Sequence, residues 1–145
     1  VLKYVGDAVI AFFPSLSNKF VVCDRAVRCG ISMLTIIKNG LNPILNQYDY
    51  PDLSAKIGID EGENIIVQYG HDEKSPLDIL SYCMSVSAKM TSLTKSNNIT
   101  IGDDVYVRLH PELRQNFVRV NYTAREWNYV SKRTGELYKL YTLKQ

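Results

Sequence analysis

The sequence has few of the features that mark several large classes of protein. Its 145 residues include 3 cysteines, an odd number, and no pair of them has the Cys-x-x-Cys spacing. We therefore expect reduced, largely buried thiols and not a disulfide framework. No apolar run is long enough to span a membrane, and no signal peptide opens the chain. These absences predict a cytoplasmic protein in which this segment makes no membrane contact.

The chain also has little net charge of either sign. Its 17 basic and 15 acidic residues leave a formal charge of +2, so no global field attracts nucleic acid or an anionic membrane. The 10 tyrosines raise the alternative of an RNA-binding sheet, which stacks bases on exposed aromatic side chains beside basic ones. No predicted strand combines aromatic and basic side chains in this way, and we expect no nucleic-acid partner.

What the sequence does contain is enough apolar material for one domain with a core, since 46% of its residues are hydrophobic. Apolar spacing and turn residues predict a strand pair, a helix, a second strand pair, a helix and further strands. This order predicts an α+β fold with helices on one face of a mainly antiparallel sheet. The predicted elements are a hairpin over residues 3–13, a helix over 18–39 ended by Asn39-Gly40, a loop over 41–52, a hairpin over 53–70, a strand over 77–80, a helix from 81 to 93–95, a strand over 99–101, a short helix over 102–109, and strands over 117–122 and 137–143, with 127–130 as a further candidate.

Lys3 and Asp7 are the only charged residues of the first hairpin, whose turn contains Gly6-Asp7. A carboxylate at the tip of a rigid hairpin is a candidate metal ligand. The alternative is that Asp7 only suits the turn, because aspartate tolerates turn backbone well. The pair His71-Asp72 has no third ligand at a suitable spacing, and we interpret it as part of a solvated loop.

The helix that begins after Ser81 carries serines and one lysine along a single stripe. Ser81 is a suitable N-cap, and Ser85 and Lys89 follow it at helical spacing. A lone lysine on such a face is most often solvated surface, and the stripe alone identifies no site.

The order of these motifs resembles the catalytic domain of class III adenylate/guanylate cyclases over nearly the whole chain. Each motif is weak alone, and their agreement in order carries the resemblance. The matching segments are residues 3–8 (Lys-x-x-Gly-Asp), 58–63 (Gly-Ile-x-x-Gly-Glu), 78–90 (Asp-x-x-Gly-x-x-Val-Asn-x-Ala-x-Arg-Met, matched without a gap) and 132–137 (Lys-Gly-x-Gly-x-Leu). The resemblance implies the ferredoxin-like nucleotide-cyclase fold.

The resemblance also implies roles for individual residues. Asp7 matches one of two aspartates that hold the catalytic Mg²⁺ or Mn²⁺ ions, which suit an in-line phosphoryl displacement. Lys3 and Asp78 match the pair that contacts the purine edge, and a lysine facing an aspartate fits adenine, hence ATP. Lys132 matches the lysine that binds the triphosphate. In the family the sites form between two such domains, which implies a homodimer or a pseudo-heterodimer.

The departures from the family pattern concern catalysis. Ser85 stands where the family has an asparagine that orients the ribose, and Lys89 where it has an arginine that stabilises the transition state. Lysine keeps the charge but loses the planar, bidentate guanidinium fork. Serine falls short of the reach of asparagine, so that a water has to bridge. Because each well-placed group contributes about a hundred- to a thousandfold in rate, two weakened groups imply slow turnover or none.

The family's other metal aspartate lies on a first, central strand that precedes the Lys-x-x-Gly-Asp hairpin, and residues 1–145 contain no such strand. We expect these residues to be a partial cyclase domain, part of a longer polypeptide or completed by another chain, because unpaired sheet edges are avoided. Two hypotheses follow. The chain belongs to an adenylate cyclase that converts ATP to cyclic AMP and pyrophosphate slowly, or it is an inactive cyclase-homology module that binds nucleotide or dimerises for signal transduction.

Overall fold

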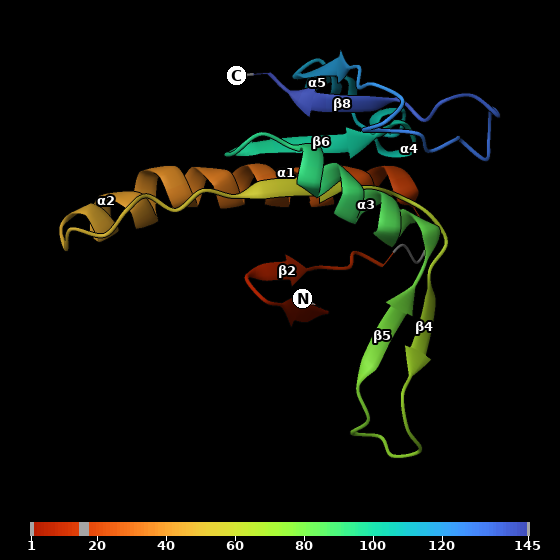
Figure 1. Ribbon diagram of the computed structural model, residues 1–145, viewed down its shortest axis with the longest axis horizontal. Helices are drawn as coiled ribbons and strands as arrows, with labels where there is room; N and C mark the ends of the chain where they lie inside the picture. Colours follow the sequence, from red (N-terminus) through yellow and green to blue (C-terminus); the bar gives the residue numbers. More distant parts are fainter. Residues whose placement is uncertain (1, 15–17, 145) are drawn as a thin grey trace.

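A computed structural model describes residues 2–14 and 18–144 as an α+β arrangement of one four-stranded sheet, two hairpins and several helices (Figure 1). In chain order the elements are β1 (Lys3–Val5), β2 (Ala8–Ile10), α1 (Lys19–Ile36), the π-helical turn η1 (Ile37–Leu41), α2 (Asn42–Asn46), β3 (Lys56–Ile59), β4 (Ile65–Gln68), β5 (Leu77–Leu80), α3 (Tyr82–Leu93), β6 (Asn98–Gly102), α4 (Asp103–Tyr106), α5 (Pro111–Arg114), β7 (Phe117–Val120) and β8 (Leu140–Leu143).

The four-stranded sheet has the order β3-β6-β8-β7, with β6 and β8 as its inner strands. β3 runs parallel to β6, with Ile57 opposite Ile99 and Ile59 opposite Ile101. β8 pairs antiparallel with both β6 and β7. All residues of β6 are buried, as expected for a central strand covered on both faces. The mixed pairing confirms the α+β prediction.

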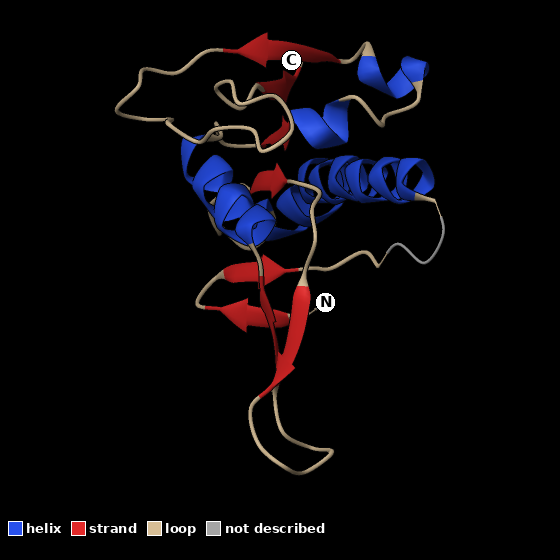
Figure 2. Cartoon of the chain, turned by 90° about the vertical axis from the view of Figure 1, so that its right-hand side faces the viewer, coloured by secondary structure: helices blue, strands red, loops and turns tan. Residues whose placement is uncertain are grey.

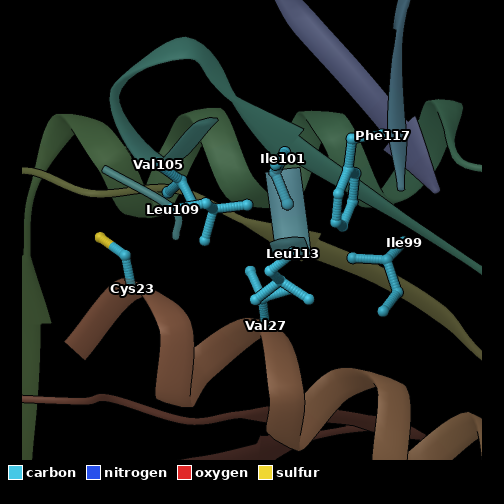
Figure 3. Packing of buried hydrophobic residues seen from close by; sticks show 8 residues of the cluster. All are labelled: Cys23, Val27, Ile99, Ile101, Val105, Leu109, Leu113 and Phe117. Carbon is cyan, nitrogen blue, oxygen red and sulfur yellow. The ribbon is translucent and has the colours of Figure 1, made fainter. Parts of the chain in front are cut away.

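The two long helices cover opposite faces of this sheet. Cys23 and Val27 of α1 pack in one core cluster with Ile99 and Ile101 of β6 (Figure 3). The alternate residue of β6, Thr100, points the other way, where its hydroxyl accepts a hydrogen bond of 2.8 Å from Thr94 at the end of α3. On this second face α3 lies so close to Gly58 of β3 that a Cβ atom there would collide with the Ser87 carbonyl oxygen. The helices are therefore not confined to one face of the sheet. Successive residues of a strand point to opposite faces, and in β3 and β6 the apolar residues meet α1 while the small residues between them meet α3.

A second core cluster joins α3 to the C-terminal part of the chain. Val86 and Met90 of α3 are fully buried against Trp127, Tyr138 and Leu140. The indole Nε1 of Trp127 donates a hydrogen bond of 2.7 Å to the carbonyl of Tyr138. The segment over 127–130 forms only an isolated bridge, Val130 to Leu137, in place of the candidate strand, and this cluster fixes its position.

The two hairpins, β1–β2 and β4–β5, lie on the same side of the molecule, away from β8 (Figures 1 and 2). The predicted hairpin over 53–70 is wrong, because β3 joins the main sheet and β4 pairs with β5. Glu61, two residues beyond the end of β3, lies 2.7 Å from Lys19 Nζ and 3.3 Å from Arg108 Nη1. From there the chain leaves the main sheet and forms β4, which pairs with β5.

The first helix also continues further than predicted. Asn39-Gly40 does not end it, because η1 accommodates the glycine and the chain proceeds directly into α2. The side chain of Asn42 then exchanges hydrogen bonds of 2.9 and 3.0 Å with the backbone of Leu53, which fixes the return of the chain.

Ser81 caps α3 as predicted, because its hydroxyl accepts a hydrogen bond of 3.0 Å from the Met84 amide. Cys23 and Cys83 are buried free thiols, whereas Cys29 is exposed. None of the described helices combines the length and apolar character that crossing a membrane requires.

Candidate functional site

The structure brings together Lys3 and Asp78, which lie 75 positions apart in the sequence. Lys3 is the first residue of β1, and Asp78 is the second residue of β5, on the other hairpin. Lys3 Nζ lies 2.7 Å from both carboxylate oxygens of Asp78. The side chains are 33% and 24% exposed, so the pair remains accessible to a ligand.

The Asp78 carboxylate is held in its charged form. The hydrogen bond from Lys3 lowers the pKa of Asp78, and a hydrogen bond of 2.8 Å from the Ile79 amide contributes in the same direction. A carboxylate has about four lone-pair sites and an ammonium group three N–H donors, so both groups keep capacity for a further partner. The pair thus presents a hydrogen-bond acceptor and a donor side by side.

Asp7 lies in the exposed turn between β1 and β2, directly after Gly6, whose φ is +60°. Such a turn is what the Gly-Asp dipeptide predicts. Within residues 2–14 and 18–144, no group of three or more His, Cys, Asp or Glu side chains could hold a metal ion. The residues present therefore do not form a metal site by themselves, and the role of Asp7 stays a prediction.

Ser85 and Lys89 lie on α3, where Ser85 is exposed and Lys89 is half-buried. Lys89 is close enough to Glu126 to contribute to the lowered pKa of that carboxyl, although hydrogen bonds from Thr123 are the main cause. The predicted helix and its stripe are confirmed in position. No hydrogen bond or ion pair of the described residues joins Asp7, Ser85 or Lys89 through its side chain to Lys3, Asp78 or Lys132.

Lys132 lies in an exposed turn, where its ammonium group is 5.2 Å from the centre of the Tyr82 ring. Tyr82 is the first residue of α3 and follows Asp78 by four positions in the sequence. The neighbour of Lys132, Arg133, anchors the turn through an ion pair of 2.7 Å with Asp103. The family motif has glycine at the position of Arg133, and sequence reasoning did not single out Tyr82 or Arg133.

A partly buried carboxylate at the end of β3 also escaped the sequence analysis. The hydroxyl of Tyr138 donates a hydrogen bond of 2.6 Å to Asp60 Oδ1 and accepts a hydrogen bond of 3.0 Å from the Asp104 amide. Burial is the main reason that the pKa of Asp60 rises to about 7, and the hydrogen bond from Tyr138 opposes it. The only sequence signal was the position of Asp60 inside the Gly-Ile-x-x-Gly-Glu segment.

The chain resembles several nucleotide cyclases. No protein-family model matches it. Over 118 residues it is 25% identical to an Escherichia coli protein named "Cytidylate cyclase", a match that spans 75% of this chain and 25% of that protein. The crystal structure of the adenylyl cyclase CyaB from P. aeruginosa superposes with a TM-score of 0.73 at 18% identity, covering 99% of this chain and 70% of its own. The guanylate cyclase domain of RhGC from Catenaria anguillulae, solved in complex with GTP, superposes with a TM-score of 0.58 at 17% identity, covering 84% of this chain and 59% of that one.

These likenesses confirm the predicted resemblance at the level of the fold. The chain spans about a quarter of the length of the curated relative that it matches. The structural neighbours include proteins named for adenylyl and for guanylyl cyclase activity, so that the fold alone does not select a base.

Proposed function

We propose that this chain, which has the fold of class III nucleotide cyclase catalytic domains, is part of a nucleotide cyclase that acts on ATP. The reaction is a lyase reaction in which the ribose 3′-oxygen attacks the α-phosphorus and pyrophosphate leaves, giving cyclic AMP. The observation that supports it most is the ion pair of Lys3 with Asp78, at the two positions expected to contact the base. We also expect a cytoplasmic location, because the substrate is a cytoplasmic metabolite.

The geometry of this pair matches the edge of adenine. Adenine presents an amino group, a donor, beside the ring nitrogen N1, an acceptor. The carboxylate of Asp78 accepts from the amino group, while the ammonium group of Lys3 donates to N1. Guanine presents the opposite order, a carbonyl beside an N–H. The carboxylate of Asp78 would then face another acceptor, and the ammonium group of Lys3 would face another donor. Discrimination against GTP follows, because unpaired polar groups are costly in a desolvated site.

CTP is the second candidate substrate, favoured by the identity to the E. coli protein named "Cytidylate cyclase". Cytosine has an amino group at C4 beside the acceptor N3, which is the same donor and acceptor order as adenine. The Lys3–Asp78 pair therefore suits both bases, and the room around the pair decides between a purine and a pyrimidine.

The remaining proposed roles concern the phosphates and the ribose. Lys132 binds the triphosphate as a charged, exposed donor, and Lys89 offers positive charge to the phosphoryl oxygens as charge builds there. Ser85 donates to the ribose directly or through a water. The lysine at 89 and the serine at 85 make slow turnover the expected behaviour of this domain.

Mg²⁺ or Mn²⁺ belongs to the proposal as the source of phosphate charge neutralisation, with Asp7 as one ligand. The described residues hold no group of three candidate ligands, and the proposal assigns only this one.

We also propose that the active form is a dimer of cyclase domains, a homodimer or a pseudo-heterodimer. The hairpins that carry Lys3 and Asp78 expose large apolar side chains, including Tyr4 at 72% and Ile65 at 67%. Exposed apolar surface of this extent is typical of protein–protein contacts. A partner domain placed there would supply the other half of the site.

The alternative is a non-catalytic module that binds nucleotide or dimerises for signal transduction. It is favoured by the serine at position 85, the lysine at 89 and the exposed, single carboxylate of Asp7. Under this alternative the Lys3–Asp78 pair still binds a base, but no cyclic product forms.

Product formation tests the two functions directly. The full-length protein is incubated with ATP, CTP, GTP or UTP and Mn²⁺, and cyclic mononucleotides are identified by mass spectrometry. We expect a cyclic product from ATP, or from CTP, and none from an Asp7→Ala control. Nucleotide binding with no product above that control would contradict the enzyme and favour the non-catalytic module.

Restoring the family's residues on α3 is expected to raise activity. The double variant Ser85→Asn with Lys89→Arg should increase kcat by about tenfold or more, because a guanidinium fork contacts phosphoryl oxygens bidentately. Initial rates with the preferred nucleotide measure the effect. Lys95→Arg, the same exchange at an exposed position beyond α3, is the matched control and should leave kcat unchanged. An unchanged rate in a correctly folded double variant would show that these two departures do not limit turnover.

A further inference from the structure

The ammonium group of Lys132 lies over the ring of Tyr82. The separation of 5.2 Å from Nζ to the ring centre is within the range of about 6 Å in which a cation is attracted to an aromatic face. In the described part of the chain, Lys132 takes part in no ion pair. Its orientation therefore depends on Tyr82 and on the backbone of its turn.

The Tyr82 ring is itself supported by a row of aromatic side chains. It meets Tyr129 edge to face, with ring centres 5.6 Å apart, and Tyr129 lies 4.8 Å from Trp127. Trp127 is 2% exposed and belongs to the core cluster under α3. Tyr82 is 45% exposed, so that the row runs from the core to the surface and ends under the lysine.

The turn that carries Lys132 is fixed independently of this contact. Arg133 Nη2 lies 2.7 Å from Asp103 Oδ2, and Arg133 Nε lies 3.5 Å from Asp104 Oδ1. The hydroxyl of Ser131 accepts hydrogen bonds from the amides of Arg133 and Thr134. The backbone of the turn is therefore held by polar contacts, and only the long side chain of Lys132 needs a separate constraint.

We propose that Tyr82 is a positioning residue that orients the Lys132 ammonium group for the triphosphate of the nucleotide. The inference rests on the proposed function, in which Lys132 binds the phosphates. A cation held on a ring face keeps its N–H donors free for phosphate oxygens. Orienting the flexible side chain before binding also reduces the conformational entropy that binding would remove.

The contact itself is tested by NMR. The ring current of Tyr82 should shift the ε-methylene protons of Lys132 upfield in the wild-type protein. Tyr82→Phe keeps the ring and should keep this shift, whereas Tyr82→Leu should abolish it. Leucine is a good helix former, and Tyr82 is half-exposed at the first position of α3, so that both variants should fold. Circular dichroism checks this.

The consequence is tested with inorganic tripolyphosphate, titrated calorimetrically into the same proteins. We expect Tyr82→Leu to weaken binding about two- to fivefold, Tyr82→Phe to bind as the wild type does, and Lys132→Ala to weaken binding more than either. If Lys132→Ala weakens binding but Tyr82→Leu does not, although its ring-current shift is lost, the positioning role is wrong and the proposed function is unaffected. If Lys132→Ala has no effect, or the wild type does not bind tripolyphosphate, the proposed role of Lys132 fails and the inference fails with it.

Discussion

Replacing Asp78 by leucine should lower kcat/KM for the preferred nucleotide by about a hundredfold or more. The substitution removes the acceptor for the amino group of the base and leaves Lys3 without its partner at 2.7 Å. A site built to pair a polar group discriminates strongly once one member of the pair is lost. Initial rates with ATP, CTP and GTP measure the effect, and the preference for amino bases over GTP should collapse along with the rate.

A double-mutant cycle with Lys3→Met separates a shared role from two independent ones. If Lys3 and Asp78 act as one unit, the double variant should lose little more than either single variant. Asp72→Leu, at an exposed position in the β4–β5 loop, is the matched control and should keep the wild-type preference. Nucleotide affinity provides the same comparison if the domain does not turn over. An unaltered base preference in Asp78→Leu would contradict the assignment of this pair to the base.

Asp60→Asn should stabilise the protein at alkaline pH and leave its stability at acidic pH nearly unchanged. The folded state holds the pKa of Asp60 at about 7, above its ordinary value of 3.8, mainly because the carboxyl is buried. An acid whose pKa is raised on folding contributes stability that is fully present below about pH 4 and is lost as the pH rises through about 7. Over this window the loss is up to about 4 kcal/mol, since each pKa unit corresponds to about 1.4 kcal/mol. Asparagine does not ionise, and its side-chain oxygen can still accept from Tyr138.

Urea unfolding of the wild-type and Asp60→Asn proteins at about pH 4 and about pH 8 measures this difference. The variant should gain about 2–4 kcal/mol over the wild type at the higher pH. Asp72→Asn, in the exposed loop, is the control for removing one negative charge and should follow the wild type at both values. Parallel pH profiles for Asp60→Asn and the wild type would show that Asp60 stays ionised in the folded state.

Several elements could be predicted because their signals are local. Ser81 precedes an apolar periodicity that favours a helix, and the structure places its cap and α3 at these residues. The strands β5 and β6 follow from short apolar runs bounded by turn residues. The order of four short motifs predicted the cyclase fold, which the structural comparisons confirm.

Other features depended on contacts that no local signal reports. The pairing of β4 with β5 instead of β3 has no local signal, and Glu61, beyond β3, forms ion pairs with two distant residues. The first helix continues through Gly40 into α2, where Asn42 contacts Leu53, 11 positions further along the sequence. The raised pKa of Asp60 could not be predicted from the sequence, because it arises mainly from burial of the carboxyl in the folded protein.

By itself, the sequence determined the class of the fold, the residues of α3 and the positions of the charged residues, since helix caps, apolar periods and motif order are properties of neighbouring residues. Only the tertiary structure decided which of those charges meet. Lys3 and Asp78 are on separate hairpins, and Lys132 reaches Tyr82 from a turn 50 positions further along the sequence. Contacts of this kind arise when a core closes and brings distant segments together, and the packing of α1 and α3 on opposite faces of one sheet provides that core here.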